Sequence, residues 1–206
     1  EEGDNTVSAL LFRVTQDTRD YVFDPTKGYV VSGSVEYAGG LFGGDKDFLR
    51  YIADGSLYFT ILEKIVLEFR MRAGIVDEFG DSTYVPIYER FFAGGAYTLR
   101  GFKERRVGPK DPNTGDPIGG EAIFLGGIEG TFPIVENIKG ALFFDMGNVW
   151  KEAGDFGSGE IKYSIGTGVR IKTPIGPVRL DFGYPLKTEE GERKTGRFHF
   201  SMGHRF

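Results

Sequence analysis

Few residues in this chain have side chains suited to catalysis. The sequence has no cysteine and only two histidines, His199 and His204, which lie in the same C-terminal segment. No nucleophile motif of the Gly-x-Ser-x-Gly kind accompanies them, and histidine and carboxylate residues do not cluster at the spacing of metal ligands. The sequence therefore predicts no catalytic residue, no metal site and no cofactor, and charge pairing is the chemistry that its residues support best.

One arginine lies in an unusual local sequence. The stretch Phe91–Phe102 reads FFAGGAYTLRGF, so Arg100 follows a pair of glycines and directly precedes a third. This stretch belongs to a connection of about residues 76–120, far longer than a usual hairpin loop. Long ordered loops generally have a function. The glycines allow the backbone to turn and to approach another segment closely.

The composition restricts the class of protein. The chain has 206 residues, a net charge of −5 and an isoelectric point of about 5.2, so we expect one domain that does not bind nucleic acid. No apolar run approaches the ~18 residues of a membrane-spanning helix. The mean hydropathy of −0.24 suits a soluble protein, but a membrane β-barrel gives a similar value because its strands alternate. The N-terminus shows no signal-peptide pattern, so we expect a mature form or a piece of a longer chain.

Strand signals with a two-residue period run through the sequence. In the segment 163–172, Tyr163 and Ile165 fall on one face, whereas Ser164 and Arg170 fall on the other. We expect nine strands, each about long enough to cross a bilayer at a tilt. The other expected strands are 29–37, 50–61, 65–75, 178–184 and 197–206, with less regular ones at 7–18, 121–132 and 139–147.

Two features favour a transmembrane β-barrel over a soluble β-sandwich, whose strands alternate as well. The polar faces have charged residues in mid-strand, which a wet or charge-paired lumen tolerates: Arg70, Asp145, Arg170 and Asp181. The connections also alternate in length, as in outer-membrane barrels. Short turns lie within 62–64, 133–138 and 173–177, and longer polar loops lie at 39–48, 76–120, 148–161 and 185–196.

The strand count gives a further expectation. The ninth strand must end on the side of the short turns, which places the start of the first strand on the side of the long loops. A single-chain bacterial barrel has an even number of strands and both ends on the periplasmic side. We therefore expect residues 1–206 to be the C-terminal portion of a longer barrel, or, with one strand miscounted, a complete barrel of eight or ten strands. Nine strands closed on themselves would displace the long loop, because side chains fill small barrels.

Three motifs resemble the BamA family of outer-membrane assembly factors and its relatives in two-partner secretion. Leu99, Arg100, Gly101 and Phe102 match the family's RGF loop motif, and the segment FFDMG, which contains Phe144–Gly147, matches its Phe-x-Asp-x-Gly strand motif. The segment PIGPVRLDFGYPL and the strand that ends at Phe206 match its last two strands, and DPTKGY at Asp24–Tyr29 is similar too. The resemblance covers essentially the whole chain. It implies the C-terminal portion of a sixteen-stranded transmembrane barrel.

The resemblance also implies a contact for the arginine. Loop 76–120 would fold into the lumen, where Arg100 would contact acidic residues of the barrel wall. The strand motif implies Asp145 as the partner, and Glu129 on the preceding strand is the second candidate. An arginine on carboxylates makes directional, charge-assisted hydrogen bonds. The alternatives are a solvated Arg100 and carboxylates that pair with other lumenal cations, such as Arg170 or Arg179.

The implied function is the insertion and folding of other proteins in the bacterial outer membrane. The first and last strands of such a barrel join weakly, and an incoming strand pairs with the edge that opens there, which is β-augmentation. Here the last strand would supply one side of that junction, with Phe198, Phe200 and the C-terminal Phe206 as sorting signal and Gly203 as a point of bending. The implied partners are outer-membrane lipids, unfolded client proteins, accessory lipoproteins and upstream POTRA domains.

Other functions are compatible with parts of the pattern. A two-partner secretion transporter shares the loop motif but exports one passenger protein, and two POTRA domains rather than several would distinguish it. A passive porin would lack the inward loop. A barrel enzyme, such as an outer-membrane protease or phospholipase, finds no support in the catalytic residue types.

Overall fold

The computed structural model describes residues 6–173, 176–188 and 194–203, which form one antiparallel sheet of nine strands in the order β1 to β9. The predicted all-β class and the number of strands are confirmed. The strands are β1 (Ala9–Asp17), β2 (Gly28–Ala38), β3 (Phe48–Ile61), β4 (Ile65–Glu78), β5 (Ala122–Val135), β6 (Ile138–Trp150), β7 (Lys162–Thr173), β8 (Gly176–Lys187) and β9 (Arg197–Met202). Single 3₁₀ turns lie at η1 (Gly40–Phe42), η2 (Ile87–Glu89) and η3 (Ala153–Asp155).

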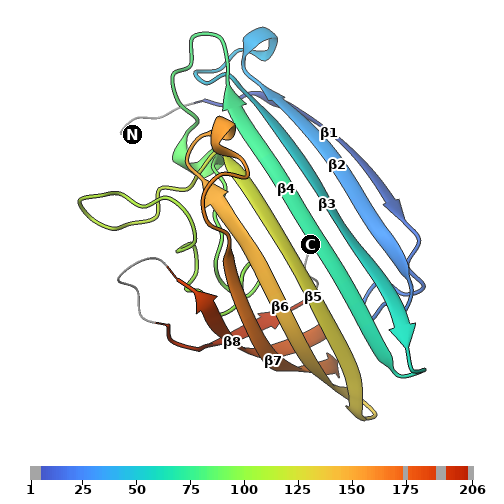
Figure 1. Ribbon diagram of the computed structural model, residues 1–206. Helices are drawn as coiled ribbons and strands as arrows, with labels where there is room; N and C mark the ends of the chain where they lie inside the picture. The colour runs from blue at the N-terminus through green and yellow to red at the C-terminus, as the bar shows by residue number, and fades with distance from the viewer. Residues whose placement is uncertain (1–5, 174–175, 189–193, 204–206) are drawn as a thin grey trace.

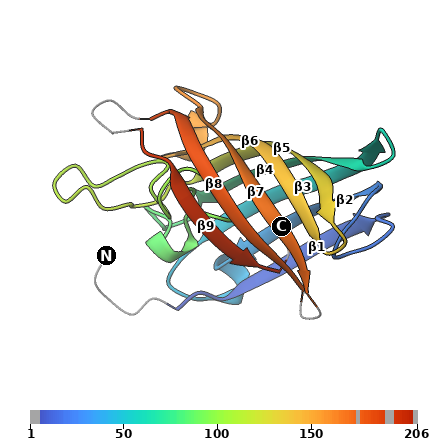
Figure 2. The same ribbon diagram turned by 90° about the horizontal axis from the view of Figure 1, so that it is seen from below.

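The sheet is curved like part of a barrel wall (Figures 1 and 2). Each strand pairs with its sequence neighbours, so β1 and β9 are the two ends of the strand order and the described wall is open. The long connections lie at one end of the strands (Figure 1). Because the wall is open, the connection between β4 and β5 has room inside the curve.

The two faces of the wall have the polarity of a barrel in lipid. Along the strands, exposed apolar side chains alternate with buried polar or charged ones. In β8, for example, Leu180 is 48 % exposed, whereas the neighbouring Asp181 is 2 % exposed. A protein in water shows the opposite polarity, whereas a transmembrane barrel places apolar residues outside and polar ones inside. Other exposed apolar residues in the strands are Val31, Tyr51, Met71, Leu142, Ile165 and Phe200. Among the described residues, none of the helical segments has the length and apolar character to span a membrane.

Most connections at the opposite end are short. β3 and β4 are joined by Leu62–Lys64, whose first two residues adopt positive φ angles of 48° and 61°, as in the primed turns that suit twisted hairpins. β5 and β6 are joined by Glu136 and Asn137 alone, so the turn is shorter than the expected 133–138 because Pro133–Val135 continue β5. The tip of the third turn, residues 174–175, lies outside the described residues.

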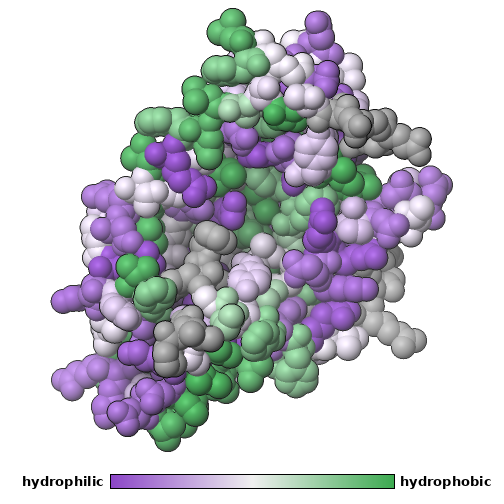
Figure 3. Space-filling view, turned by 180° about the vertical axis from the view of Figure 1, so that it is seen from behind, coloured by the Kyte–Doolittle hydropathy of each residue, from purple (hydrophilic) through white to green (hydrophobic). Residues whose placement is uncertain are grey.

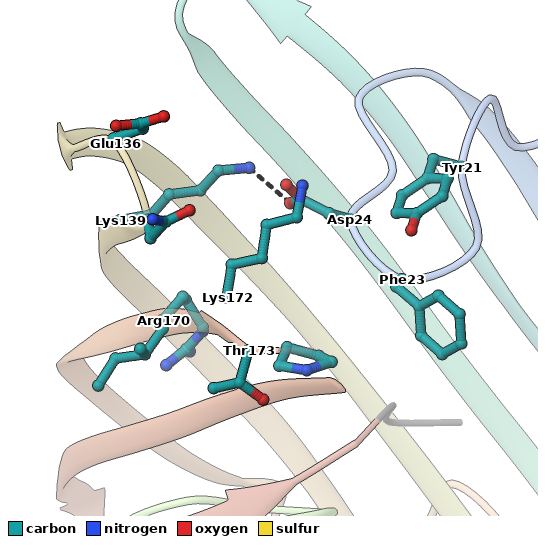
Figure 4. A pocket seen from close by; sticks show the side chains of 11 residues that line it. Tyr21, Phe23, Asp24, Glu136, Lys139, Arg170, Lys172 and Thr173 are labelled. Atoms are coloured by element: carbon teal, nitrogen blue, oxygen red, sulfur yellow. Dashed lines mark hydrogen bonds and ion pairs between the residues drawn. The ribbon is translucent and has the colours of Figure 1, made fainter. Parts of the chain in front are cut away.

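One connection at this end departs from the pattern of short turns. Thr18–Lys27, between β1 and β2, is held in shape by Asp20, whose carboxylate accepts the Thr26 N–H at 2.9 Å and the Thr26 hydroxyl at 2.5 Å. These bonds lower the pKa of Asp20 below its ordinary value. Across the interior, Lys139 of β6 contacts Asp24 at 2.5 Å, beside a cavity of about 480 Å³ (Figure 4). The connection therefore narrows the interior at this end.

The apolar core lies inside the curve, near the end with the long connections. Residues of the connection between β4 and β5 pack there against the inner face of the wall. Seen from behind, this side of the molecule is hollowed, with polar and apolar residues around the hollow (Figure 3). From the connection, the core contains Val85, Phe91, Ala93, Leu99, Phe102 and Val107, and from the wall it contains Ala38, Phe48, Val76, Ile123, Leu125 and Val149.

Candidate functional site

Arg100 lies at the centre of the interior and is fully buried, with 0 % of its surface exposed. It belongs to the connection between β4 and β5, which we call the long loop (residues 79–121). Its Nε and Nη2 donate to the two carboxylate oxygens of Asp145 on β6, at 2.7 and 2.8 Å. Its backbone N–H also donates to Asp145, at 3.2 Å. This is the parallel, two-bond geometry in which arginine and carboxylate groups bind most specifically.

The remaining guanidinium nitrogen of Arg100 contacts two further strands. Nη1 donates to Glu129 of β5 at 2.6 Å and, more weakly, to Asp181 of β8 at 3.4 Å. The guanidinium carbon lies 3.3 Å from the ring centre of Phe143, so one face of the cation rests on an aromatic ring. A single side chain of the long loop thus contacts β5, β6 and β8.

Two arginines of the wall complete the cluster. Arg170 of β7 donates to Glu129 at 2.9 Å and to Asp181 at 2.7 Å, and Arg70 of β4 contacts Asp145. The guanidinium groups of Arg70, Arg100 and Arg170 therefore face three carboxylates, those of Asp145, Glu129 and Asp181. Buried charges are tolerated away from water when they are paired and joined by hydrogen bonds, as these are.

The cluster holds Arg100 as a cation. Burial alone would lower the pKa of Arg100, but the charges of Asp145 and Glu129 outweigh burial and raise it above its ordinary value. The carboxylates are already bound by guanidinium groups. In the part of the chain that the structure describes, no group of three or more histidine and carboxylate side chains is placed to hold a metal ion.

Glycines allow the long loop to lie directly on the wall. Gly101 adopts a positive φ of 88°, which a residue with a side chain rarely takes. Gly183 of β8 lies beneath it, and a Cβ atom at Gly183 would lie 2.5 Å from the Gly101 nitrogen. Leu99 and Phe102, on either side, are 0 % and 6 % exposed within the core. The loop motif is therefore fixed by backbone contact and apolar packing as well as by charge.

The structure brings Arg100, Asp145 and Glu129 together. The carboxylates make both kinds of contact that were considered from the sequence. Asp145 and Glu129 bind Arg100, and they also contact arginines of the wall. The residues singled out in the last strand are not part of this cluster: Phe198 and Phe200 of β9 are 86 % and 64 % exposed. Gly203, with φ of 90°, turns the backbone directly after β9, and Phe206 lies outside the described residues.

Four residues of the site were not assigned to it from the sequence. Asp181 and Arg70 were recognised only as charges on the polar face of their strands, and Arg170 only as an alternative partner of the carboxylates. His199 of β9 was assigned no role, yet its Nε2 accepts the Gly101 N–H at 2.9 Å. Alternation places these residues inside the barrel, but it does not say which of them meet across strands that are not neighbours.

Comparison with known proteins identifies the family. The model of the Omp85 superfamily domain matches residues 1–206. The chain is 37 % identical over 209 residues to the outer membrane protein assembly factor BamA of Nitratidesulfovibrio vulgaris, a match that covers 100 % of this chain and 26 % of that protein. It is 28 % identical over 214 residues to a SAM50-like protein of Drosophila melanogaster, covering 99 % of this chain and 46 % of the relative.

A solved structure has the same fold. The crystal structure of BamA from Haemophilus ducreyi lacking POTRA domains 1–3 superposes with a TM-score of 0.80 at 24 % sequence identity. The match covers 93 % of this chain and 41 % of that one. The chain thus spans between about a quarter and a half of the length of these relatives.

We expect Gly183→Ala to displace the loop motif, because the added methyl group would overlap the backbone of Gly101. Overpacking of this kind costs about 1–3 kcal/mol. The rate of tryptic cleavage after Lys103, in folded protein in detergent, measures the displacement. Gly33→Ala on β2 is the matched control, because a Cβ there meets no atom within 4 Å. Equal cleavage of the two variants would show that the loop does not rest on β8.

We expect Arg100→Ala to lower the free energy of unfolding by about 3–5 kcal/mol, because it leaves buried carboxylates without their partner. Arg100→Lys should recover only part of this, since an ammonium group lacks the fork that binds Asp145 twice. Urea unfolding in detergent micelles gives both values. Arg105→Lys, at an exposed position on the same loop, should change stability by less than about 0.5 kcal/mol. A similar small change for Arg100→Ala would mean that the cluster does not stabilise the fold.

Proposed function

Because the chain belongs to the Omp85 superfamily, we propose that it forms part of an outer-membrane β-barrel that folds and inserts other β-barrel proteins. A relative with 37 % identity over the whole chain bears the name of an outer membrane protein assembly factor. The bacterial outer membrane is the proposed location. The SAM50-like relative indicates that the same fold also occurs in eukaryotes.

The observation that supports this function best is the state of β9. This strand has six residues, whereas its neighbour β8 has twelve. Among the described strands it is an end of the strand order, where β8 pairs with it on one side and the Met202 carbonyl accepts the Tyr97 hydroxyl. Phe198 and Phe200 are exposed along it, as expected for a strand that faces lipid or another apolar strand.

A short edge strand suits the acceptance of an incoming strand. An unpaired backbone group in hydrocarbon costs several kcal/mol, so a client strand that reaches the membrane gains by pairing with any available edge. β9 offers such an edge, and β-augmentation needs only main-chain hydrogen bonds and suitable alternation of side chains. The Arg100 cluster ties β5, β6, β7 and β8 to the long loop. The wall beside β9 would therefore stay rigid while a client strand pairs with β9.

The proposal extends to the rest of the assembly. We place residues 1–206 in the C-terminal portion of a larger barrel, with the long loop folded into its lumen. The chain matches 26 % and 46 % of the length of two relatives, which supports its being part of a longer protein. The proposed partners are outer-membrane lipids, unfolded client proteins, accessory lipoproteins and upstream POTRA domains.

A disulfide that closes the free edge of β9 should block assembly. The chain contains no cysteine, so Phe200→Cys can be paired with a cysteine in the strand that neighbours β9 in the full-length barrel. In liposomes, the oxidised protein should lose most of its ability to fold a small client barrel, measured by the client's heat-dependent mobility on a gel. Reduction should restore it.

A second disulfide provides the control for this experiment. Leu180 and Phe200 are direct partners across β8 and β9, and a pair of this type has the Cα separation that a disulfide needs. Oxidation of Leu180→Cys with Phe200→Cys fixes an existing pair and leaves the edge free. The proposed function would be contradicted if the protein with the edge of β9 closed folded the client as fast as the oxidised Leu180→Cys, Phe200→Cys control.

A further inference from the structure

The edge of β9 that faces away from β8 includes the carbonyl of Met202. Met202 pairs with Val178 of β8, and the next residue, Gly203, donates its N–H to the Pro177 carbonyl at 3.0 Å. In an antiparallel ladder, successive residues direct their backbone polar groups to opposite sides of the strand. Because Gly203 bonds toward β8, the N–H and the carbonyl of Met202 point away from β8, to the side where a further strand would pair.

A side chain of the long loop already uses this carbonyl. The hydroxyl of Tyr97 donates to the Met202 oxygen at 3.4 Å, although the two residues are 105 positions apart. Tyr97 lies in a tight turn of the loop, in which the Gly95 N–H donates to the Leu99 carbonyl at 3.2 Å and the Thr98 hydroxyl to the Gly94 carbonyl at 2.8 Å. The turn positions the tyrosine only three residues before the buried Arg100.

A second contact joins the same loop to the inner face of β9. The Gly101 N–H donates to Nε2 of His199 at 2.9 Å. His199 lies opposite Asp181 in the register of β8 and β9, and Asp181 is a member of the Arg100 cluster. The residue that follows Arg100 therefore contacts β9, while Arg100 itself contacts β5, β6 and β8.

We propose that Tyr97 and His199 are positioning residues that hold β9 to the long loop, and that the Tyr97 hydroxyl occupies an edge position that an incoming strand would use. The second half of this proposal rests on the proposed function, because it requires that the edge accepts a client strand. A strand that pairs along β9 needs the Met202 carbonyl for one of its own N–H groups. The Tyr97 hydroxyl competes with that N–H for the same carbonyl, which weakens the binding of an incoming strand.

Tyr97→Phe tests the edge position, since it removes the hydroxyl and leaves the ring. The probe is a fluorescently labelled peptide GPVRLDFGYPLK, which copies β8, the strand whose alternation already matches β9. Its binding to the full-length protein in detergent micelles is followed by anisotropy. Loss of one competing hydrogen bond should tighten binding about fivefold. Tyr51→Phe, at an equally exposed tyrosine on β3 (47 % against 48 %), should bind as the wild type does. Equal affinities for all three proteins would overturn the edge assignment.

Two variants of His199 test the contact on the inner face. His199→Leu removes the acceptor for the Gly101 N–H, whereas His199→Gln keeps an acceptor oxygen at a similar distance from the backbone. Hydrogen exchange of the backbone amides in Arg197–Met202 should speed up several-fold in His199→Leu and return close to the wild-type rate in His199→Gln. Exchange in β3 serves as the internal reference. Wild-type exchange in His199→Leu, or equal loss in both variants, would overturn the positioning role.

The two readouts separate this inference from the proposed function. Exchange and peptide binding are measured without any client folding. If both respond as expected while the wild-type protein folds no client barrel, the contacts stand and the proposed function fails. If client folding proceeds while neither readout responds, the proposed function stands and the inference fails.

Discussion

The structure depends on one electrostatic constraint: a fully buried guanidinium group must be matched by carboxylates. Arg100 satisfies it by contacting three of them, on β5, β6 and β8. Removal of a charge from water costs several kcal/mol, and only close geometry with further hydrogen bonds recovers that cost. The wall arginines Arg70 and Arg170 pair with the same group of carboxylates. The charges of the cluster are therefore paired only when the long loop and the wall are assembled in this one arrangement.

Other features of the interior follow from this arrangement. The long loop must pass close to β8 to place Arg100, so a glycine is needed on each side of the contact, Gly101 in the loop and Gly183 in the wall. The apolar residues of the loop then cover the inner surface near the long connections. The described wall is open, which leaves space for the loop. The apolar outer face needs no such matching, because lipid is its expected solvent.

The sequence predicted the wall more completely than the site. Period-2 alternation was sufficient to place nine strands and to assign Leu180 and Asp181 to opposite faces, because neighbours in a strand always alternate. The contact of Arg100 with Asp145 came from the resemblance to a family, since no local rule relates residues 45 positions apart. The roles of Asp181 and Arg70 were missed because alternation gives the face of a residue but not its partners across the lumen. The ten-residue connection between β1 and β2 is longer than the short turns at its end of the strands, and local hydrogen bonds to Asp20 stabilise it.

A double-mutant cycle between Arg100 and Asp145 tests the central claim most directly. The free energies of unfolding of the wild type, Arg100→Gln, Asp145→Asn and the double variant are measured by urea titration under one set of micelle conditions. If the two side chains form the interaction that joins loop to wall, their coupling energy should reach about 2–3 kcal/mol, at the upper end for residues in contact. Additive effects, with a coupling below about 0.5 kcal/mol, would contradict the account, because the loop would then be held in the lumen by other contacts.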